Sequence, residues 1–244
     1  MQKTPKEYII FPLDFPGMEV ARSHIRQLDG WVGMFKIGLE LFIRQGPAVV
    51  EEVRKMSSAG IFLDLKLHDI STTVGRAMAR VADLGVDLVT VHGACSPKML
   101  GAAVENAGKT KVLAVTLLTD NDADMVRAQG FKDEYATAPE KLVLLRARMA
   151  LDAGCAGVVC SGQEAAMLKA LLDKGCLTVT PGIRPQWSIT PGDDQKRVVT
   201  PAKAVQAGSD YIVIGRPIRD AKDPARAAEK VALEIEAGLS GTAT

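Results

Sequence analysis

Short apolar runs alternate with longer amphipathic stretches eight times along this chain of 244 residues. The short runs have the length of buried strands, and the longer stretches have the spacing of helices. Strict alternation of strand and helix predicts right-handed crossovers and a parallel sheet. The eight strands are expected at Tyr8–Leu13, Trp31–Ile37, Ile61–Leu67, Val86–Val91, Lys111–Leu118, Ala156–Cys160, Leu177–Thr180 and Asp210–Ile214.

The helices between these strands follow from apolar spacing and from start and stop signals. Two of them are expected to begin at a capping residue followed by proline, Ser96-Pro97 and Thr200-Pro201, where the missing proline N–H is not needed. The segment 120–138 is expected to be irregular, with at most one short helix. The other helices are expected at Met18–Leu28, Leu39–Ser57, Thr72–Leu84, Pro139–Ala153, Gln163–Lys174 and Pro224–Ala237.

Eight strand–helix units at this length predict an α/β protein that forms a single-domain (β/α)8 TIM barrel, a fold of roughly 250 residues. An open doubly wound sheet is the alternative. It is disfavoured because no Gly-x-Gly-x-x-Gly follows the first strand and nothing divides the chain into two halves. We expect one domain over residues 1–244, with a frayed tail from about residue 238.

Charge and composition exclude several classes of protein. The 30 basic and 29 acidic residues leave no excess of positive charge, so we expect no binding to nucleic acid or to a membrane surface. No apolar run approaches the roughly eighteen residues of a membrane span, and residues 1–6 lack the features of a secretory signal. The four cysteines form no Cys-x-x-Cys pair, which favours buried thiols in a cytoplasmic protein.

The third expected strand carries an unusual density of charge. Asp64 and Lys66 lie two positions apart, so they project from the same face of the strand, and Asp69 follows beyond the strand end. A parallel sheet covered by helices has no wet face, so these charges must be paired or take part in chemistry. A structural ion pair at the strand end is the alternative interpretation.

Active sites of such barrels lie at the carboxyl ends of the strands, where Lys36 of the second strand joins Asp64 and Lys66. Two cations then flank one anion. A lysine held protonated in this way can donate a proton to a developing carbanion. A carboxylate that faces an anionic substrate group raises the energy of that state until the group departs as a neutral molecule. This combination favours decarboxylation over hydrolysis.

The segments after the last two strands indicate a phosphate site. Gly182-Ile183-Arg184-Pro185 opens the seventh loop and Gly215-Arg216 follows the eighth strand. Barrels often bind phosphate with these two loops, and arginine can bind it through two hydrogen bonds. The length of the segment 181–199 favours a mobile lid over a simple connector, with a surface loop as the alternative.

With these motifs in view, the sequence resembles the orotidine 5′-phosphate decarboxylase family over nearly its full length. Sugar-phosphate decarboxylases and synthases of the same superfamily share the Asp-x-Lys-x-x-Asp motif, and the motifs after strands seven and eight make the match specific. The residues that carry the resemblance are Leu13-Asp14, Phe35-Lys36-Ile37-Gly38, Asp64-x-Lys66-x-x-Asp69-Ile70, Thr180-Pro181-Gly182-Ile183-Arg184-Pro185 and Ile214-Gly215-Arg216-Pro217.

The resemblance implies decarboxylation of orotidine 5′-phosphate to UMP in de novo pyrimidine biosynthesis, with no metal and no organic cofactor. By the same resemblance, Lys66 protonates C6 of the pyrimidine and Asp64 faces the substrate carboxylate. Lys36 would contact Asp64 and the ribose, Asp14 a ribose hydroxyl, and Thr119 the pyrimidine.

The resemblance also implies a homodimer in which Asp69, with Ile70 and Thr73, completes the active site of the other subunit. The phosphate would be held by Gln195, Arg216 and the N–H of Gly215, with Arg184 in the closing loop; Gln186 is the alternative to Gln195. This chain departs from the family at Ser71-Thr72-Thr73, where many members have Pro-Asn-Thr.

Two other functions stay open at this point. A metal-dependent sugar-phosphate decarboxylase or aldolase would need Mg²⁺ and an extra carboxylate, for which Glu40 is the nearest candidate beyond Lys36. A non-catalytic barrel that binds a phosphate ligand would not need Lys36, Asp64 and Lys66 together. His92 is expected to be structural, because a lone histidine at a strand end is more often hydrogen-bonded than catalytic. His68 is expected to be structural because it alternates away from Lys66.

Overall fold

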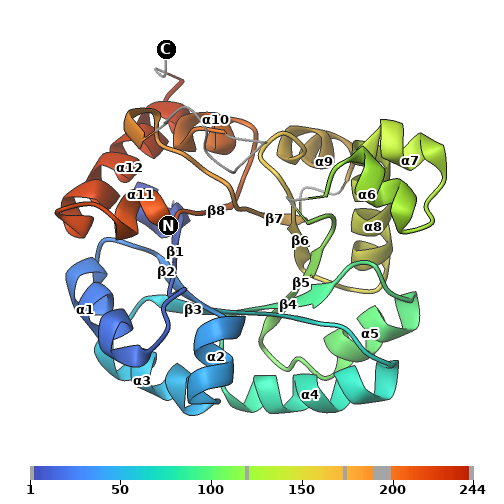
Figure 1. Ribbon diagram of the computed structural model, residues 1–244, viewed down its shortest axis with the longest axis horizontal. Coiled ribbons are helices and arrows are strands. Elements are labelled where there is room, and N and C mark those ends of the chain that lie inside the picture. The colour runs from blue at the N-terminus through green and yellow to red at the C-terminus, as the bar shows by residue number, and fades with distance from the viewer. Residues whose placement is uncertain (1–2, 119–120, 173–174, 189–198, 242–244) are drawn as a thin grey trace.

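The computed structural model of the chain describes residues 3–118, 121–172, 175–188 and 199–241. Eight parallel strands form a closed barrel in which each strand pairs with the next and β8 pairs with β1 (Figure 1). The predicted (β/α)8 barrel is therefore confirmed. The strands are β1 Ile9–Pro12, β2 Met34–Gly38, β3 Gly60–Leu67, β4 Leu88–His92, β5 Lys111–Val115, β6 Gly157–Val159, β7 Leu177–Thr180 and β8 Tyr211–Val213.

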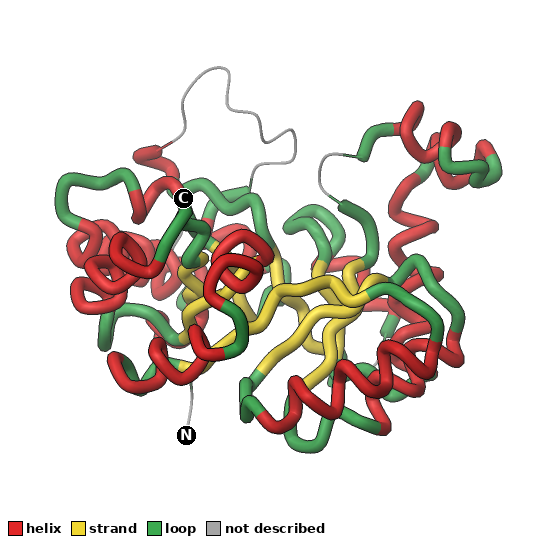
Figure 2. Tube along the Cα trace, turned by 60° about the horizontal axis from the view of Figure 1, so that its bottom comes forward, coloured by secondary structure: helices red, strands yellow, loops and turns green. Residues whose placement is uncertain are grey.

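Helices surround the barrel as an outer ring (Figure 1), and α6 and α7 project beyond the strands on one side (Figure 2). No helix in the described ranges is long and apolar enough to cross a membrane. The helices are η1 Pro5–Tyr8, α1 Met18–Leu28, α2 Leu39–Gln45, α3 Ala48–Met56, α4 Ser71–Asp83, α5 Pro97–Glu105, α6 Ala123–Ala128, α7 Asp133–Thr137, α8 Pro139–Asp152, α9 Ala165–Leu171, η2 Gln186–Ser188, α10 Pro201–Gln206, α11 Arg216–Arg219 and α12 Pro224–Leu239.

Two helix starts predicted from the sequence are confirmed. The Ser96 hydroxyl accepts a hydrogen bond from the Met99 N–H, and the Thr200 hydroxyl accepts one from the Lys203 N–H. In both helices proline takes the first helical position, where its missing N–H leaves no hydrogen bond unmade.

Three helix predictions are wrong in detail. The single helix expected over Leu39–Ser57 is split into α2 and α3, because Gly46 has a φ of +67° and Pro47 follows it. The segment 120–138 contains two short helices, α6 and α7, and the Asp122 side chain caps the first. The last helix, expected to end at Ala237, continues to Leu239, so Gly238, expected in the frayed tail, lies inside α12.

Gly238 shows why the last helix is longer than expected. It is buried where α12 packs against α10, and a Cβ at this position would lie 2.6 Å from the carbonyl oxygen of Ala202. The absence of a side chain therefore permits the two helices to approach closely, and their packing stabilises the last turn of α12.

The core has two layers separated by the strands. Side chains that face the barrel interior form a small buried cluster of Ile10, Phe62, Leu88, Leu113 and Val179. Their neighbours along the strands face outwards and join the larger core beneath the helices, because successive strand residues point to opposite faces. The interior is thus filled with apolar side chains below the carboxyl ends of the strands.

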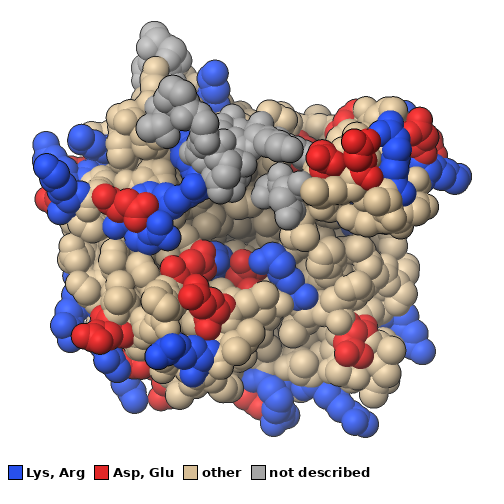
Figure 3. Space-filling model, in the orientation of Figure 1, with Lys and Arg blue, Asp and Glu red and all other residues tan. Residues whose placement is uncertain are grey.

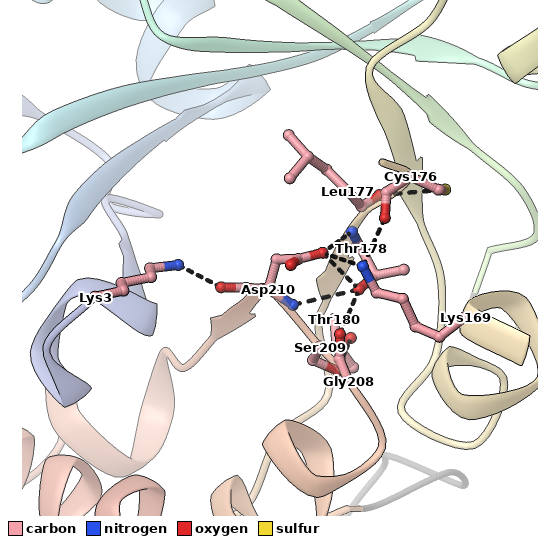
Figure 4. A network of polar contacts seen from close by, with 9 residues as sticks. All are labelled: Lys3, Lys169, Cys176, Leu177, Thr178, Thr180, Gly208, Ser209 and Asp210. Carbon is pink, nitrogen blue, oxygen red and sulfur yellow. Dashed lines mark hydrogen bonds and ion pairs between the residues drawn. The ribbon is translucent and has the colours of Figure 1, made fainter. Parts of the chain in front are cut away.

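A polar network joins β7, β8 and the N-terminal segment at the opposite end of the barrel (Figure 4). The Asp210 carboxylate accepts hydrogen bonds from the Thr178 N–H and from Lys169, both at 2.7 Å. Lys3 donates to the Asp210 carbonyl and lies 3.3 Å from the centre of the Tyr211 ring. Burial lowers the pKa of Lys3 to about 8. These contacts close the amino-terminal end of the barrel and serve its stability.

Gly157 provides a test of the barrel packing. A Cβ at this position of β6 would lie 2.0 Å from the carbonyl oxygen of Leu177 in β7, so Gly157→Ala must move backbone. We expect it to lower the free energy of unfolding by about 3 kcal/mol, as measured by urea denaturation. Gly101→Ala is the control, because a Cβ there meets nothing within 4 Å and alanine favours the helix. Equal stability of the two variants would contradict this account.

Candidate active site

A hollow at the centre of one barrel face is bordered by both basic and acidic side chains (Figure 3). It contains a cavity of about 180 Å³, lined by Lys36, Asp64 and Lys66. Its other walls are apolar side chains from β3, β5, β6, β7 and β8 and the segments that follow them. The cavity lies at the carboxyl ends of the strands, where barrels of this type place their active sites.

Four charges of alternating sign form a row at this end of the barrel. The Lys36 ammonium lies 2.9 Å from the Asp14 carboxylate and 3.6 Å from the Asp64 carboxylate. The Lys66 ammonium lies 2.9 Å from both oxygens of Asp64. Because Asp14 follows β1, Lys36 lies in β2 and the other two lie in β3, the order of strands in the barrel sets the order of charges. The structure thus brings together four residues that the sequence placed at strand ends.

The backbone of β3 is irregular at Lys66. Leu63 pairs with Val89 and Leu67 pairs with Val91, so three residues of β3 lie between these pairs where β4 has one, Thr90. Among the described residues other than glycine, Lys66 alone has a positive φ, of +50°. This conformation costs about 1–2 kcal/mol for a residue with a side chain. Asp64 and Lys66 do share one cavity, but a bulge and not regular alternation directs the lysine into it.

Sequence reasoning missed Thr90. This fully buried residue of β4 donates a hydrogen bond from its hydroxyl to Asp64 Oδ1 at 2.8 Å. The same hydroxyl accepts the Lys66 N–H at 2.9 Å. Threonine is common in strands, so a threonine in β4 does not by itself indicate a functional residue. The available signal was its position as a polar residue in an otherwise apolar run.

The Asp64 carboxylate is held in its charged form. Burial by itself would raise the pKa of this carboxyl, but the positive charges of Lys36 and Lys66 outweigh the effect. Hydrogen bonds from Lys66 and Thr90 act in the same direction, so the pKa of Asp64 lies below its usual value. A carboxylate at this place can repel an anionic group of a bound molecule while the lysine beside it donates a proton.

Asp69, Ile70 and Thr73 lie apart from this cavity in their own chain. All three are exposed, and the described residues that line the cavity do not include them. Asp69 accepts the Ile70 N–H at 2.6 Å, and the Ile70 side chain is 71% exposed. They are therefore accessible to a second molecule.

A second concave region contains three arginines. Arg184, Gly215 and Arg216 line it, as does Arg219, which sequence reasoning did not select and which pairs with Asp220. Arg184 is buried, and its guanidinium donates to the Ile183 carbonyl at 3.2 Å. Pro181 and Val213 line both this region and the cavity at Lys66, so the two adjoin. One molecule can thus reach from the lysines to the arginines.

Thr119 and Gln195 lie outside the described residues. The His68 and His92 rings stack 5.3 Å apart, and His92 accepts the Ala94 N–H, which agrees with a structural role. Burial, followed by the charges of His68, Arg146 and Lys66, lowers the pKa of His92. Within the described part of the chain, no group of three or more His, Cys, Asp or Glu residues is arranged to hold a metal ion.

The pKa of Asp64 predicts a pH dependence of stability. Because its folded-state pKa lies below the unfolded value of about 3.9, its stabilising contribution is complete above that pH and is lost as the pH falls through the folded pKa. We expect wild type to lose stability relative to Asp64→Asn below about pH 4, measured by urea denaturation from neutral pH downward. Asp152→Asn, on the exposed side of α8, is the control. The difference in unfolding free energy between this variant and wild type should not change over the same pH range. A difference independent of pH would contradict the prediction.

Comparisons of the sequence and of the structure with known proteins lead to the same family. A family model described as "Orotidine 5'-phosphate decarboxylase / HUMPS family" matches residues 7–231. The orotidine 5′-phosphate decarboxylase of Desulfosudis oleivorans is 45% identical over 239 residues, which cover 97% of this chain and 96% of the relative. That of Anaeromyxobacter sp. (strain K) is 46% identical over 229 residues, covering 93% and 98%. The solved structure of orotidine 5′-phosphate decarboxylase from Lactobacillus acidophilus has a TM-score of 0.81 and 34% identity, covering 93% and 98%. The chain belongs to the orotidine 5′-phosphate decarboxylase / HUMPS family.

Proposed function

We propose that this protein decarboxylates orotidine 5′-phosphate to UMP in pyrimidine biosynthesis. The observation that carries the proposal is the row Asp14, Lys36, Asp64 and Lys66 beside a small cavity. The two curated relatives described above are named for this activity and match nearly the whole chain. The alternative of a metal-dependent sugar-phosphate enzyme is less well supported, because both relatives are named orotidine 5′-phosphate decarboxylase and neither is named a sugar-phosphate enzyme.

The reaction breaks the bond between C6 of the pyrimidine and the carboxylate carbon. Asp64, held ionised, faces the substrate carboxylate, and the repulsion between them disappears when carbon dioxide leaves as a neutral molecule. The electron pair stays on C6. The Lys66 ammonium stabilises this charge and donates a proton to C6, which gives UMP, and the lysine recovers its proton from water.

The phosphate supplies binding energy at a distance from the reacting carbon. We assign it to Arg184, Arg216 and the Gly215 N–H, which line the region that adjoins the lysine cavity. Binding energy from such a remote group can offset the cost of placing one carboxylate against another. Lys36 and Asp14 are assigned to the ribose. Gln195 is proposed for the phosphate and Thr119 for the pyrimidine on the resemblance alone.

We also propose that the protein acts without a metal or organic cofactor, as one domain, in the cytoplasm. All four cysteines are free, which suits a reducing compartment. The functional unit is proposed to be a homodimer. Asp69, Ile70 and Thr73 are exposed, and so are Leu39 and Ile43 on α2, which follows the strand next to β3. A second copy that covers these side chains would bury apolar surface and receive Asp69.

A direct assay tests the activity. Purified protein in excess EDTA should consume orotidine 5′-phosphate. The reaction is measured as the loss of the ultraviolet absorbance of the substrate. Lys66→Ala should lower kcat by about 10³-fold, because it removes the proton donor. Lys55→Ala, on the exposed face of α3, is the matched control and should keep wild-type kcat. No turnover by wild type would contradict the proposal, and turnover that needs Mg²⁺ would favour the metal-dependent alternative.

Subunit mixing tests the shared sites. Lys66→Ala and Asp69→Ala proteins should each be nearly inactive. After random exchange about half the dimers are mixed, and each mixed dimer has one site with both residues intact, so about one quarter of wild-type activity should return. Exchange is verified by native mass spectrometry with one isotopically labelled partner. Verified exchange without recovery would show that the residues act within one chain.

A further inference from the structure

We propose that Thr90 is a positioning residue, whose hydroxyl holds the Asp64 carboxylate and the Lys66 backbone in the arrangement that directs both side chains into the cavity. This inference rests on the proposed function and deepens it. Nothing in the family motifs quoted above includes Thr90, which lies on β4 and outside the charged row.

The hydrogen bonds of Thr90 have only one possible direction. A backbone N–H can only donate, so the Thr90 hydroxyl must accept from the Lys66 N–H. Because Asp64 is ionised, its oxygens can only accept, so the single hydroxyl proton is donated to Asp64 Oδ1, 2.8 Å away. A hydrogen bond donated to a carboxylate stabilises its charged form. Thr90 therefore favours the charged form of Asp64.

The backbone of β3 shows what the second hydrogen bond does. Between Leu63 and Leu67 the ladder to β4 is interrupted, and in this gap Lys66 adopts its left-handed φ of +50°. The Lys66 N–H therefore donates to the Thr90 hydroxyl of β4 and not to a backbone carbonyl of that strand. A left-handed conformation is unfavourable for lysine, so it persists only where surrounding contacts hold it. Thr90 provides such a contact at the residue that bears the proton donor.

The other side chains in polar contact with the Asp64 carboxylate are charged. Lys36 of β2 contacts Oδ2, and the Lys66 ammonium contacts both oxygens. Lysine side chains are flexible, and their attraction to a carboxylate has little directional preference. The hydroxyl of a buried β-branched residue is more restricted, because few χ1 rotamers are open to such a side chain. Thr90 thus restrains the position of Oδ1 in the carboxylate that the two lysines neutralise.

A purely structural role is the competing explanation. Buried threonines commonly donate to a backbone carbonyl, as Thr110 does to Val86 and Thr116 does to Val159. Thr90 differs because both of its partners belong to residues assigned to the reaction. Thr110 is a suitable control, since it is buried, donates one hydrogen bond of 2.9 Å and lies directly before β5, at the end of that strand away from the cavity.

Three variants test the inference. Thr90→Val removes the hydroxyl and keeps the shape, Thr90→Ser keeps the hydroxyl, and Thr110→Val removes a buried hydroxyl elsewhere. We expect Thr90→Val to lower kcat by about 10- to 100-fold, the equivalent of one hydrogen bond to a charged group, with a much smaller change in KM. The acidic limb of its kcat–pH profile should move to higher pH, since Asp64 is then protonated more easily. Thr90→Ser should restore most of kcat, and Thr110→Val should leave kcat unchanged.

The outcomes separate this inference from the proposed function. Wild-type kcat and an unchanged pH profile in Thr90→Val would overturn the role of Thr90, as would an equal loss in Thr90→Ser. If the wild-type protein does not turn over orotidine 5′-phosphate, the proposed function is wrong. The positioning role of Thr90 is then tested by ¹³C NMR, without reference to activity. Thr90→Val should then still raise the pKa of the Asp64 carboxyl and shift the Lys66 Cα resonance. Both signals unchanged would overturn the inference without reference to activity.

Discussion

The Asp64 carboxylate between two lysine ammonium groups is the interaction on which the rest of the site depends. A carboxylate as buried as Asp64 would become protonated without a nearby positive charge, and two lysines at this distance would repel one another without the carboxylate between them. Together with Asp14, which is exposed, they form a row of alternating charge, and the attraction between Lys36 and Asp64 lowers the cost of burying both. Lys36, Asp64 and Lys66 line a largely apolar cavity, where electrostatic interactions with a substrate are stronger than in water.

The barrel supports this row from below and from the side. Apolar side chains fill the interior beneath the charges, so the charged groups occupy a shallow cavity at the carboxyl ends of the strands. Gly38 gives space at the side, because a Cβ there would lie 2.7 Å from Asp14 Oδ1 and 3.1 Å from Lys36 Nζ. The glycine that ends β2 is therefore part of the geometry that lets Asp14 and Lys36 meet.

Much of the fold could be predicted because its signals are local. Strand β7 and helix α1 have the predicted ends, and the caps at Ser96 and Thr200 form as expected, since each depends on a few adjacent residues. The predictions that were wrong depended on competing local signals or on distant contacts. Apolar spacing continued across Gly46 and Pro47, where the backbone turns, and the last turn of α12 is stabilised by packing against α10.

The sequence by itself determined the order of strands, and with it the presence of Asp14, Lys36, Asp64 and Lys66 on neighbouring elements at one end of a barrel. It did so because the alternation of faces and the order of units are properties of consecutive residues. Only the tertiary structure decided that Lys66 reaches the cavity through a bulge and that Thr90 bonds both members of the pair. The register between β3 and β4 joins residues more than twenty positions apart, and no local pattern specifies it.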